Sequence, residues 1–528
     1  MKRISLLLVL TLLVTTIGVG IVSANQPVAQ KAAATRQDAN RLVIGTTDDI
    51  SSLDPAEAYS FHDWEILRNV SEGLLAYIPG STECEARLAT DFPVKSEDGL
   101  SYTFTLRDDA MFPDGTVLTP EIFSQWAMRS LTLQGSVYGL INLITTVAPG
   151  ADPNTVVFTL SQPDDLFTIK ICSMPALYPF QEGDLPMDTI TNTPAALHGV
   201  GAYQLVSYTV GENATFQVNP NYYGDAPAYD EIDFTYYEDD AQLTLAVENG
   251  DIDMAWRSVT PTEVQRLADS EQLDVITLPG RINYLSFNVQ KDPVSNLLVR
   301  RAFAKAIDRD EIIDRAIGGL ATPIYSMVPP GFIGATESYL DLYDVRDLEG
   351  AIADLTEAGY SADNKLQLEL WFPPERYGGW SADAMAIVKE QIEETGLVEI
   401  TLQSQEWASY RPAATAGEYP FFFLGWFFDY PDADNYIAPF ARSIDSVGLG
   451  INLNDPQMDS LIDAERTAVG TDGREEALAA VQDYYAEQVP TIPLLVGQDY
   501  MVWNVTRVTN VIIGAPLVLE YRLLQPVQ

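Results

Sequence analysis

The chain has 528 residues, of which 47 % are hydrophobic, and this composition predicts a substantial buried core spread over two or three domains. Its formal net charge is −45, from 75 Asp and Glu against 30 Lys and Arg. A surface of that sign repels a phosphate backbone, so we expect no nucleic-acid partner, and it disfavours an anionic membrane surface. Self-repulsion at this charge favours a soluble monomer.

Residues 1–24 have the pattern of a secretory signal peptide. Two basic residues precede an apolar run over residues 4–22, and Val22-Ser23-Ala24 matches a small-residue cleavage site. The run is about long enough to span a bilayer, so an uncleaved N-terminal anchor is the alternative. In both cases we expect an extracytoplasmic protein, at the cell surface or in the periplasm, with residues 25–41 as a flexible tether.

The chain contains only two cysteines, Cys84 and Cys172. Outside the cytoplasm an even pair suggests a disulfide. In the chain-entropy model, closing a loop of that length would stabilise the fold by about 4 kcal/mol. Two buried thiols are the alternative, and the sequence does not decide between them.

Strands and helices alternate along the chain, which predicts an α/β fold. The expected strands are 41–47, 100–106, 154–160, 203–208, 231–237, 250–256, 281–288, 366–372, 398–403, 419–427, 492–496 and 510–524. The expected helices are 63–75, a helix beginning at Thr119 and Pro120, 241–248, 293–317 as one long helix or a helix pair, 348–358, 381–395 and 474–488. Thr119 is a good N-cap, and Pro120 suits the first position of a helix.

The most unusual stretch is 421–435, which reads FFFLGWFFDYPDADN and places one carboxylate, Asp429, among seven aromatic residues. A buried carboxylate is costly unless a cation or several donors neutralise it. With Trp426 and Tyr430 beside it, Asp429 therefore predicts a pocket for the ammonium group of a ligand. The alternative is a core strand that ends in a capping Asp.

The motifs of common catalytic and metal sites are missing from the sequence. The only histidines, His62 and His198, are far apart, and no zinc-protease, nucleophile-elbow or P-loop pattern occurs. Asp432-Ala433-Asp434 lacks the later residues of a calcium loop and is interpreted as a turn. We therefore expect no metal, no cofactor and no enzymatic activity, with a secreted hydrolase as a distant alternative.

Nine segments carry a family resemblance, and they occur in consistent order from about residue 42 to the C-terminus. They are SSLDP (51–55), SEGLLAY (71–77), SEDGLSYTFTLRDDAMFPDGTVLTPEIF (96–123), GVGAYQLVSY (199–208), NPNYYGDAPAYDEIDF (219–234), ENGDIDM (248–254), VRRAFAKAIDRDEII (299–313), LTEAGY (355–360) and GWFFDYPDADN (425–435). Together they resemble the peptide/nickel-type family of solute-binding proteins of ABC importers, which includes oligopeptide- and dipeptide-binding proteins.

The resemblance implies a two-lobed periplasmic-binding-protein-like fold of class II, in its large three-domain variant. Lobe one would comprise 42–72, 190–281 and 497–528, with a small accessory domain at 73–189, and lobe two would be 282–496. Two connecting strands would act as a hinge, and the ligand would be held in the cleft between the closing lobes. Both cysteines would lie in the accessory domain, which favours the disulfide somewhat.

In peptide-binding members of this family, the Asp that follows the Gly-Trp pair accepts the ligand α-ammonium, and the matching residue is Asp429. By the same matching, the backbone near Gly425 and Phe427 would bond an extended peptide by strand addition. The remaining candidates for the ligand-facing wall are Trp426, Trp256, Phe61 and Tyr138. Ordinary packing is the alternative for Trp256 and Phe61.

The sequence also departs from the family. Basic residues that some peptide-binding members carry near this strand are replaced by Ala414 and Phe423, so a peptide's carboxyl end would be held differently, with Arg257 or Arg281 as candidate partners. The expected function is a receptor that captures short peptides and delivers them to ABC importer permease subunits. The alternatives are an oligosaccharide or another amine as ligand, or a sensor that signals to a partner.

Overall fold

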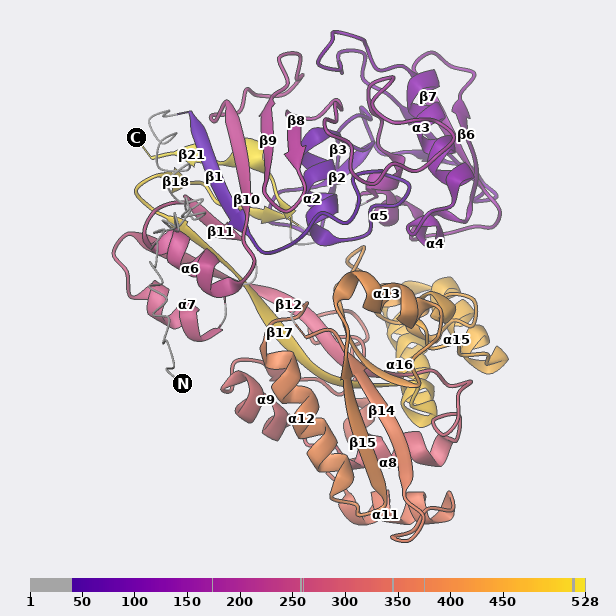
Figure 1. The fold of residues 1–528 in the computed structure, drawn as a ribbon. Helices are drawn as coiled ribbons and strands as arrows, with labels where there is room; N and C mark the ends of the chain where they lie inside the picture. Colours follow the sequence, from indigo (N-terminus) through magenta and orange to yellow (C-terminus); the bar gives the residue numbers. More distant parts are fainter. Residues whose placement is uncertain are drawn as a thin grey trace, which may run out of the picture.

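The computed structural model describes residues 40–172, 174–256, 259, 261–343, 346–374, 376–514 and 518–527 (Figure 1). The predicted signal peptide and the tether up to residue 39 lie outside these ranges. Strand β1, Arg41–Thr46, begins where the strand 41–47 was predicted, so Arg41 belongs to this strand and not to the end of the tether. Among the described residues, no helix is long and apolar enough to cross a membrane.

An eleven-stranded sheet runs through the molecule in the order β15-β14-β16-β12-β17-β11-β1-β10-β9-β8, with β13 paired to β17. Its two longest strands, β12 (Leu273–Phe287) and β17 (Thr491–Asn504), are antiparallel partners. Figure 1 shows that these two strands pass from the upper half of the molecule to the lower half. The sheet therefore joins two bodies through one pair of strands.

We call the body that begins at β1 lobe one. Its helices and strands besides β1 are α2 (Phe61–Val70), β2 (Leu75–Tyr77), β3 (Cys84–Ala86), β4 (Val94–Lys95), β5 (Ser101–Thr105), α3 (Pro120–Leu133), α4 (Tyr138–Ile141), β6 (Ile144–Pro149), β7 (Thr155–Leu160), α5 (Phe167–Cys172), η1 (Pro175–Leu177), β8 (Tyr203–Thr209), β9 (Asn213–Val218), β10 (Glu231–Tyr236), α6 (Asp240–Glu248), β11 (Met254–Trp256), α7 (Pro261–Ala268), β18 (Val508–Thr509), β19 (Ile513–Gly514), β20 (Val518–Leu519), η4 (Tyr521–Leu523) and β21 (Gln525–Pro526). Strands β4 to β7 form a separate four-stranded sheet.

We call the other body lobe two. Its elements are α8 (Leu297–Ala306), α9 (Arg309–Ile317), β13 (Thr322–Pro323), α10 (Ser338–Tyr343), α11 (Leu348–Glu357), β14 (Leu366–Phe372), α12 (Trp380–Glu393), β15 (Val398–Ser404), α13 (Trp407–Thr415), β16 (Phe421–Trp426), η2 (Ala433–Tyr436), α14 (Ala438–Ala441), η3 (Ser446–Leu449), α15 (Pro456–Thr467) and α16 (Gly470–Gln488). Helix α12 packs on β14 and β15, which run parallel.

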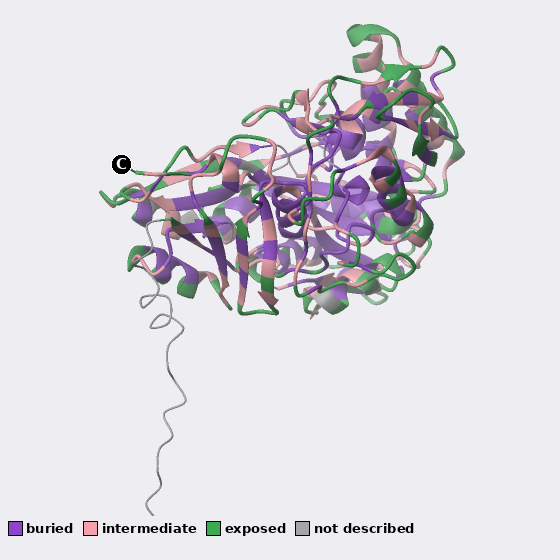
Figure 2. Cartoon of the chain, turned by 90° about the horizontal axis from the view of Figure 1, so that it is seen from above, coloured by how far each residue is buried: buried purple, intermediate pink, exposed green. Residues whose placement is uncertain are grey.

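Each lobe is organised around its own hydrophobic core. Figure 2 shows buried segments in the interior of the molecule and exposed loops at its periphery. The core of lobe two is built from buried side chains between Ile282 and Leu495. The core of lobe one collects buried side chains from both ends of the chain, from Leu42 to Leu524. One side chain from the lobe-two segments, Phe427, belongs to the lobe-one core. Two separate cores give the two-lobed α/β architecture that the resemblance implied.

The strands that join the lobes are irregular at the crossing. The pairing of β12 with β17 shifts register between Pro279 and Ile282. A Cβ atom at Gly280 would lie 2.5 Å from the carbonyl carbon and oxygen of Gly497, so the two backbones approach here without a side chain between them. A second register shift follows directly, between Asn283 and Tyr284. Closely packed backbone beside two irregularities in the pairing makes this crossing the natural place for a hinge.

Local signals predicted several elements correctly. Helix α3 begins at Pro120, and the Thr119 hydroxyl accepts a hydrogen bond from the Ile122 N–H, as an N-cap does. Other boundaries were wrong. Helix α2 ends at Val70 rather than at residue 75, because residues 75–77 pair as β2 with β3. The predicted strand 510–524 is broken into the short strands β19 and β20 and the turn η4.

Strands β12 and β17 both extend well beyond the predicted ranges 281–288 and 492–496. The missed portions pair with each other, so their partners are distant in sequence. The two cysteines are joined: Cys84 in β3 and Cys172 at the end of α5 form a disulfide with their Cα atoms 6.3 Å apart.

Candidate functional site

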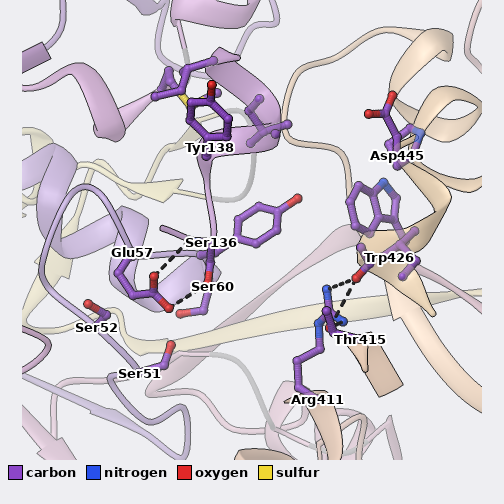
Figure 3. A pocket seen from close by; sticks show the side chains of 18 of the residues that line it. Ser51, Ser52, Glu57, Ser60, Ser136, Tyr138, Arg411, Thr415, Trp426 and Asp445 are labelled. Carbon is purple, nitrogen blue, oxygen red and sulfur yellow. Dashed lines mark hydrogen bonds between the residues drawn. The ribbon is translucent and has the colours of Figure 1, made fainter. Parts of the chain in front are cut away.

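A cavity of about 2090 Å³ lies where the two lobes face each other. Lobe one contributes loop residues 47–60 and the segment 136–144, and lobe two contributes α13 and the segment 438–449. Pockets for small molecules commonly occupy about 300–1,000 Å³, so this cavity has room for a larger or more extended guest. Figure 3 shows side chains from both lobes pointing into the space, among them Tyr138 from one side and Trp426 from the other.

Asp429 lies at the contact between the lobes. Its Oδ2 accepts hydrogen bonds from the Tyr59 hydroxyl of lobe one at 3.1 Å and from the Asn435 amide at 3.1 Å. Tyr59, Trp426 and Asn435 line the cavity, whereas Asp429 is not among the described residues that line it and is only 6 % exposed. Burial raises the pKa of Asp429 to about 7, although the hydrogen bonds from Asn435 and Tyr59 lower it. The carboxylate therefore sits directly behind the cavity wall.

A network of paired charges supports the turn that follows Asp429. Arg466 donates to both oxygens of the fully buried Asp434, at 2.7 and 3.0 Å. Arg474 donates to both oxygens of Asp432, at 2.9 and 2.6 Å, and contacts Glu465 at 3.4 Å. Burial and the neighbouring Asp434 raise the pKa of Glu465, so a protonated Glu465 can donate to Asp434. These bonds tie the turn to helices α15 and α16.

Phe61 and Phe427 also join the lobes. Their rings meet edge to face with centroids 5.2 Å apart, and Phe427 stacks on Phe428 at 4.6 Å. Neither ring is among the described residues that line the cavity. In this arrangement Phe61 and Phe427 hold the lobes together beside the cavity rather than facing a ligand.

Trp256 lies in the core of lobe one and not at the cavity. It is fully buried, and its indole N–H donates to the Glu65 carboxylate at 2.6 Å. The same Glu65 oxygen accepts from the Leu519 N–H at 3.2 Å. A tryptophan that pairs with a buried carboxylate in this way packs the fold, which was the alternative to a ligand-facing role.

Gly425 has no space for a side chain. A Cβ atom there would lie 2.9 Å from both the Asn283 amide nitrogen and the Tyr377 ring. Asn283 pairs with Gly425 across β12 and β16, and β14 pairs with β16 only at Phe421 and Phe422. From residue 423 onward, the edge of β16 that faces β14 pairs with no other strand of the described sheet. An extended peptide could add to the sheet as a new strand along this edge.

Among the charged side chains that line the cavity, none of which the sequence predicted, Arg411 and Asp445 stand out. Arg411, on α13, donates to the Thr415 hydroxyl and, at 3.0 Å, to the Gly448 carbonyl oxygen, and no carboxylate in the described ranges forms an ion pair with it. Asp445 lines the same wall. Of the two arginines predicted to hold a carboxyl end, Arg281 pairs instead with Asp499 at 3.3 Å, and residue 257 lies outside the described residues.

Within the described ranges, no group of three or more His, Cys, Asp or Glu side chains is placed to hold a metal ion. What the cavity does present is a mixture of aromatic faces, hydroxyl groups and unneutralised charge. This combination is suited to an organic solute that carries charged groups and apolar parts.

Two lobes, one pair of connecting strands and a cavity lined from both sides define a binding protein that closes around a solute. The chain belongs to the bacterial extracellular solute-binding proteins of family 5, because the family pattern described as "family 5 Middle" matches residues 83–446. This confirms the family resemblance and the fold class, and it places solute binding outside the cytoplasm as the family's activity.

Known relatives agree with this assignment. The dipeptide-binding protein of Escherichia coli K12 is 27 % identical over 390 residues, which cover 69 % of this chain and 71 % of that protein. The binding protein DppA of Helicobacter pylori, solved with the peptide STSA, has a TM-score of 0.80 at 22 % identity, covering 92 % of this chain and 98 % of that one. AgaA of A. tumefaciens R10, solved with agropinic acid, has a TM-score of 0.79 at 23 % identity, covering 92 % and 97 %.

Proposed function

We propose that this protein is an extracytoplasmic receptor that captures short peptides between its lobes and delivers them to an ABC importer. The observation that carries the proposal is the cavity itself, which has a buried carboxylate behind one part of its wall and, on another, a guanidinium that pairs with no described carboxylate. A peptide with free ends carries the two opposite charges. A relative named for dipeptide binding and an ABC transporter-associated binding protein solved with a bound peptide support the same ligand class.

In this proposal the ligand α-ammonium is neutralised at Asp429 and the ligand carboxylate at Arg411. A carboxylate offers about four acceptor positions, so an ammonium can join or replace the Tyr59 hydroxyl at Asp429. A guanidinium presents a fork of donors that matches a carboxylate. Trp426 and Tyr138 would form opposite walls around the side chains of the peptide, and the β14 side of Gly425 and Phe427 would bond its backbone.

The proposal extends to the organisation of the chain. We propose a cleaved signal peptide over residues 1–24, lobe one at 42–72, 190–281 and 497–528, the accessory domain at 73–189, and lobe two at 282–496. The separate core between Ile282 and Leu495 and the separate sheet of β4 to β7 support these boundaries. We also propose that the protein is a receptor and not an enzyme, since its family is defined by solute binding.

The test is thermal shift and calorimetry with a library of di- and tripeptides. A peptide that binds only the folded protein stabilises it by about 2.7 kcal/mol at one hundred times its Kd, and this raises Tm. We expect N-acetylation of the peptide and the substitution Asp429→Asn each to abolish binding. Equal binding of acetylated and free peptides would refute the role of Asp429. Binding of oligosaccharides or amines without peptides would refute the peptide assignment, and cleavage products in the same incubations would indicate a hydrolase.

A further inference from the structure

One carboxylate on the lobe-two wall of the cavity has no partner among the residues that the structure describes. Asp445 lines the cavity, and among the described residues no donor forms a hydrogen bond or ion pair with its side chain. It occupies the N-cap position of η3, yet it makes no capping hydrogen bond. Figure 3 shows its carboxylate on the same wall as Trp426, directed toward the open space. The side chain thus faces the position of a ligand rather than serving its own helix.

The cations nearest to Asp445 are each engaged by another acid. Arg442 donates to Asp463 at 2.7 Å, and Arg466 donates to Asp434 at 2.7 Å. Those two pairs belong to lobe two. From lobe one, Lys170 donates to Asp164 at 2.8 Å. This corner of the cavity therefore keeps one unneutralised negative charge, although cations surround it.

The environment makes that charge costly in the unliganded protein. Burial raises the pKa of Asp445, while Arg466 and Arg442 lower it. A partly buried carboxylate without a partner gains more from a ligand cation than an exposed one does, because little water competes for it. The other carboxylates at the cavity are either partnered or exposed. Glu57 accepts two hydrogen bonds from Ser136, Asp164 accepts one from Lys170, and Asp48 lies 3.8 Å from Arg376. Asp49, Glu238 and Glu406 are exposed.

An aromatic face lies beside this carboxylate. Trp426 lines the cavity and is held by an edge-to-face contact with Phe440, with ring centroids 5.2 Å apart. Lysine and arginine side chains have apolar stems that cover such rings while their charged ends reach an acid. The wall near Asp445 therefore matches a long basic side chain better than a short polar one.

We propose that Asp445 and Trp426 form a side-chain subsite for the ammonium or guanidinium group of a basic residue, so that the receptor prefers peptides containing lysine or arginine. This inference rests on the proposed peptide-binding function and adds to it a preference that Asp429 and Arg411 do not explain, since those two groups meet only the peptide ends. The basic side chain would form its ion pair with Asp445 when the lobes close.

The experiment is calorimetry with tripeptides of alanine in which lysine, or the uncharged norleucine of the same length, replaces each position in turn. For the position that reaches the subsite, we expect the wild-type protein to bind the lysine peptide about tenfold more tightly than its norleucine counterpart. Asp445→Asn should reduce this preference to less than about twofold while leaving the norleucine affinity unchanged. Asp49→Asn removes the same charge from the lobe-one side of the cavity and should preserve the preference.

The outcomes separate the two proposals. Peptides that bind without any lysine preference, or a preference that survives Asp445→Asn, overturn the subsite but leave peptide binding standing. A loss of affinity for all free-amine peptides in Asp445→Asn means that Asp445 holds the α-ammonium, which also overturns the subsite. If no peptide binds the wild-type protein, both proposals fall. A circular dichroism melt shows that each variant is folded.

Discussion

The carboxylates behind the cavity wall and two charged groups on it, Arg411 and Asp445, are neutralised differently. Behind the wall, Asp432 and Asp434 each accept two bonds from one arginine, Arg474 and Arg466 respectively. On the wall, Arg411 donates only to neutral oxygens, and Asp445 has no partner among the described residues. Charges that are neutralised within the protein stabilise the fold, whereas charges left open at a cavity are available to a ligand.

The largest effect is expected where this internal pairing is broken. Arg466→Ala would leave Asp434, a carboxylate with no exposed side-chain surface, without its guanidinium. We expect the free energy of unfolding to fall by about 3–5 kcal/mol, the usual cost of orphaning a buried charge. Urea unfolding followed by fluorescence measures it.

Arg442→Ala is the matched control for that measurement. Its partner Asp463 has a side chain that is 62 % exposed, so breaking the pair should cost at most about 1 kcal/mol. If the two substitutions cost the same, the cluster behind the wall is not a structural support, and the contrast between the two regions is lost.

Asp429 lies behind the cavity wall but is proposed to bind the ligand, so both protein stability and ligand affinity should depend on its protonation. Burial raises its pKa to about 7 from an ordinary value of 3.8, so the folded protein holds this proton between those values while the unfolded chain releases it. Its contribution to the stability of the unliganded protein therefore falls as pH rises from about 4 to about 7. A ligand ammonium needs the ionised form, so affinity should weaken by up to about tenfold for each pH unit below 7.

Calorimetry between pH 5 and 7 tests this linkage, because the α-amino group stays protonated throughout that range. Binding at pH 6 should release close to one proton, which comparison of two buffers with different ionisation enthalpies detects. For Asp429→Asn we expect no measurable binding of free-amine peptides at any pH in this range. A wild-type Kd that is flat over this range would contradict an ammonium bound at Asp429.

The next effect concerns the opposite end of the ligand. Arg411→Gln should raise the Kd of peptides with a free carboxylate about tenfold, because a charged hydrogen bond contributes about 1.5–3 kcal/mol. Stability should change by less than about 1 kcal/mol, since the guanidinium bonds only Thr415 and Gly448 within the described protein. Peptides amidated at the C-terminus should bind both proteins equally. If the substitution weakens amidated peptides just as much, Arg411 positions the wall and does not hold the carboxylate.

The sequence could predict those parts of the site that are encoded locally. The Gly-Trp pair and the carboxylate after it lie within five residues, so Trp426 and Asp429 were identified together and do lie at one place in the fold. Arg411 and Asp445 were missed because they belong to segments, α13 and the approach to η3, for which no periodic pattern was seen. Only the packing of these segments around β16 brings their charges to one wall.

Trp256 is the opposite case, a residue that was predicted at the site but lies in the core. Its sequence position is compatible with either place. The hydrogen bond that ties it to the core is donated to Glu65, which is 191 positions away and could not be foreseen from the local sequence. Partners that are distant in sequence also explain why two strands were predicted too short. Strands β12 and β17 are longer than predicted because their outer halves are stabilised by each other and not by a local alternation of side chains.

The smallest effect, and the most direct probe of the interlobe contact, is expected from Tyr59→Phe. The substitution removes only the hydroxyl that donates to Asp429 across the lobes. One such bond contributes about 1 kcal/mol, so peptide Kd should rise about fivefold if the bond helps to keep the lobes closed. Because this bond lowers the pKa of Asp429, its loss should also move the midpoint of the pH dependence above 7.

Tyr138→Phe is the control, since it removes a hydroxyl from the same cavity without touching Asp429. A midpoint that shifts in neither variant would mean that Tyr59 and Asp429 are apart when the ligand enters, and the ammonium would then meet a carboxylate held by lobe two alone.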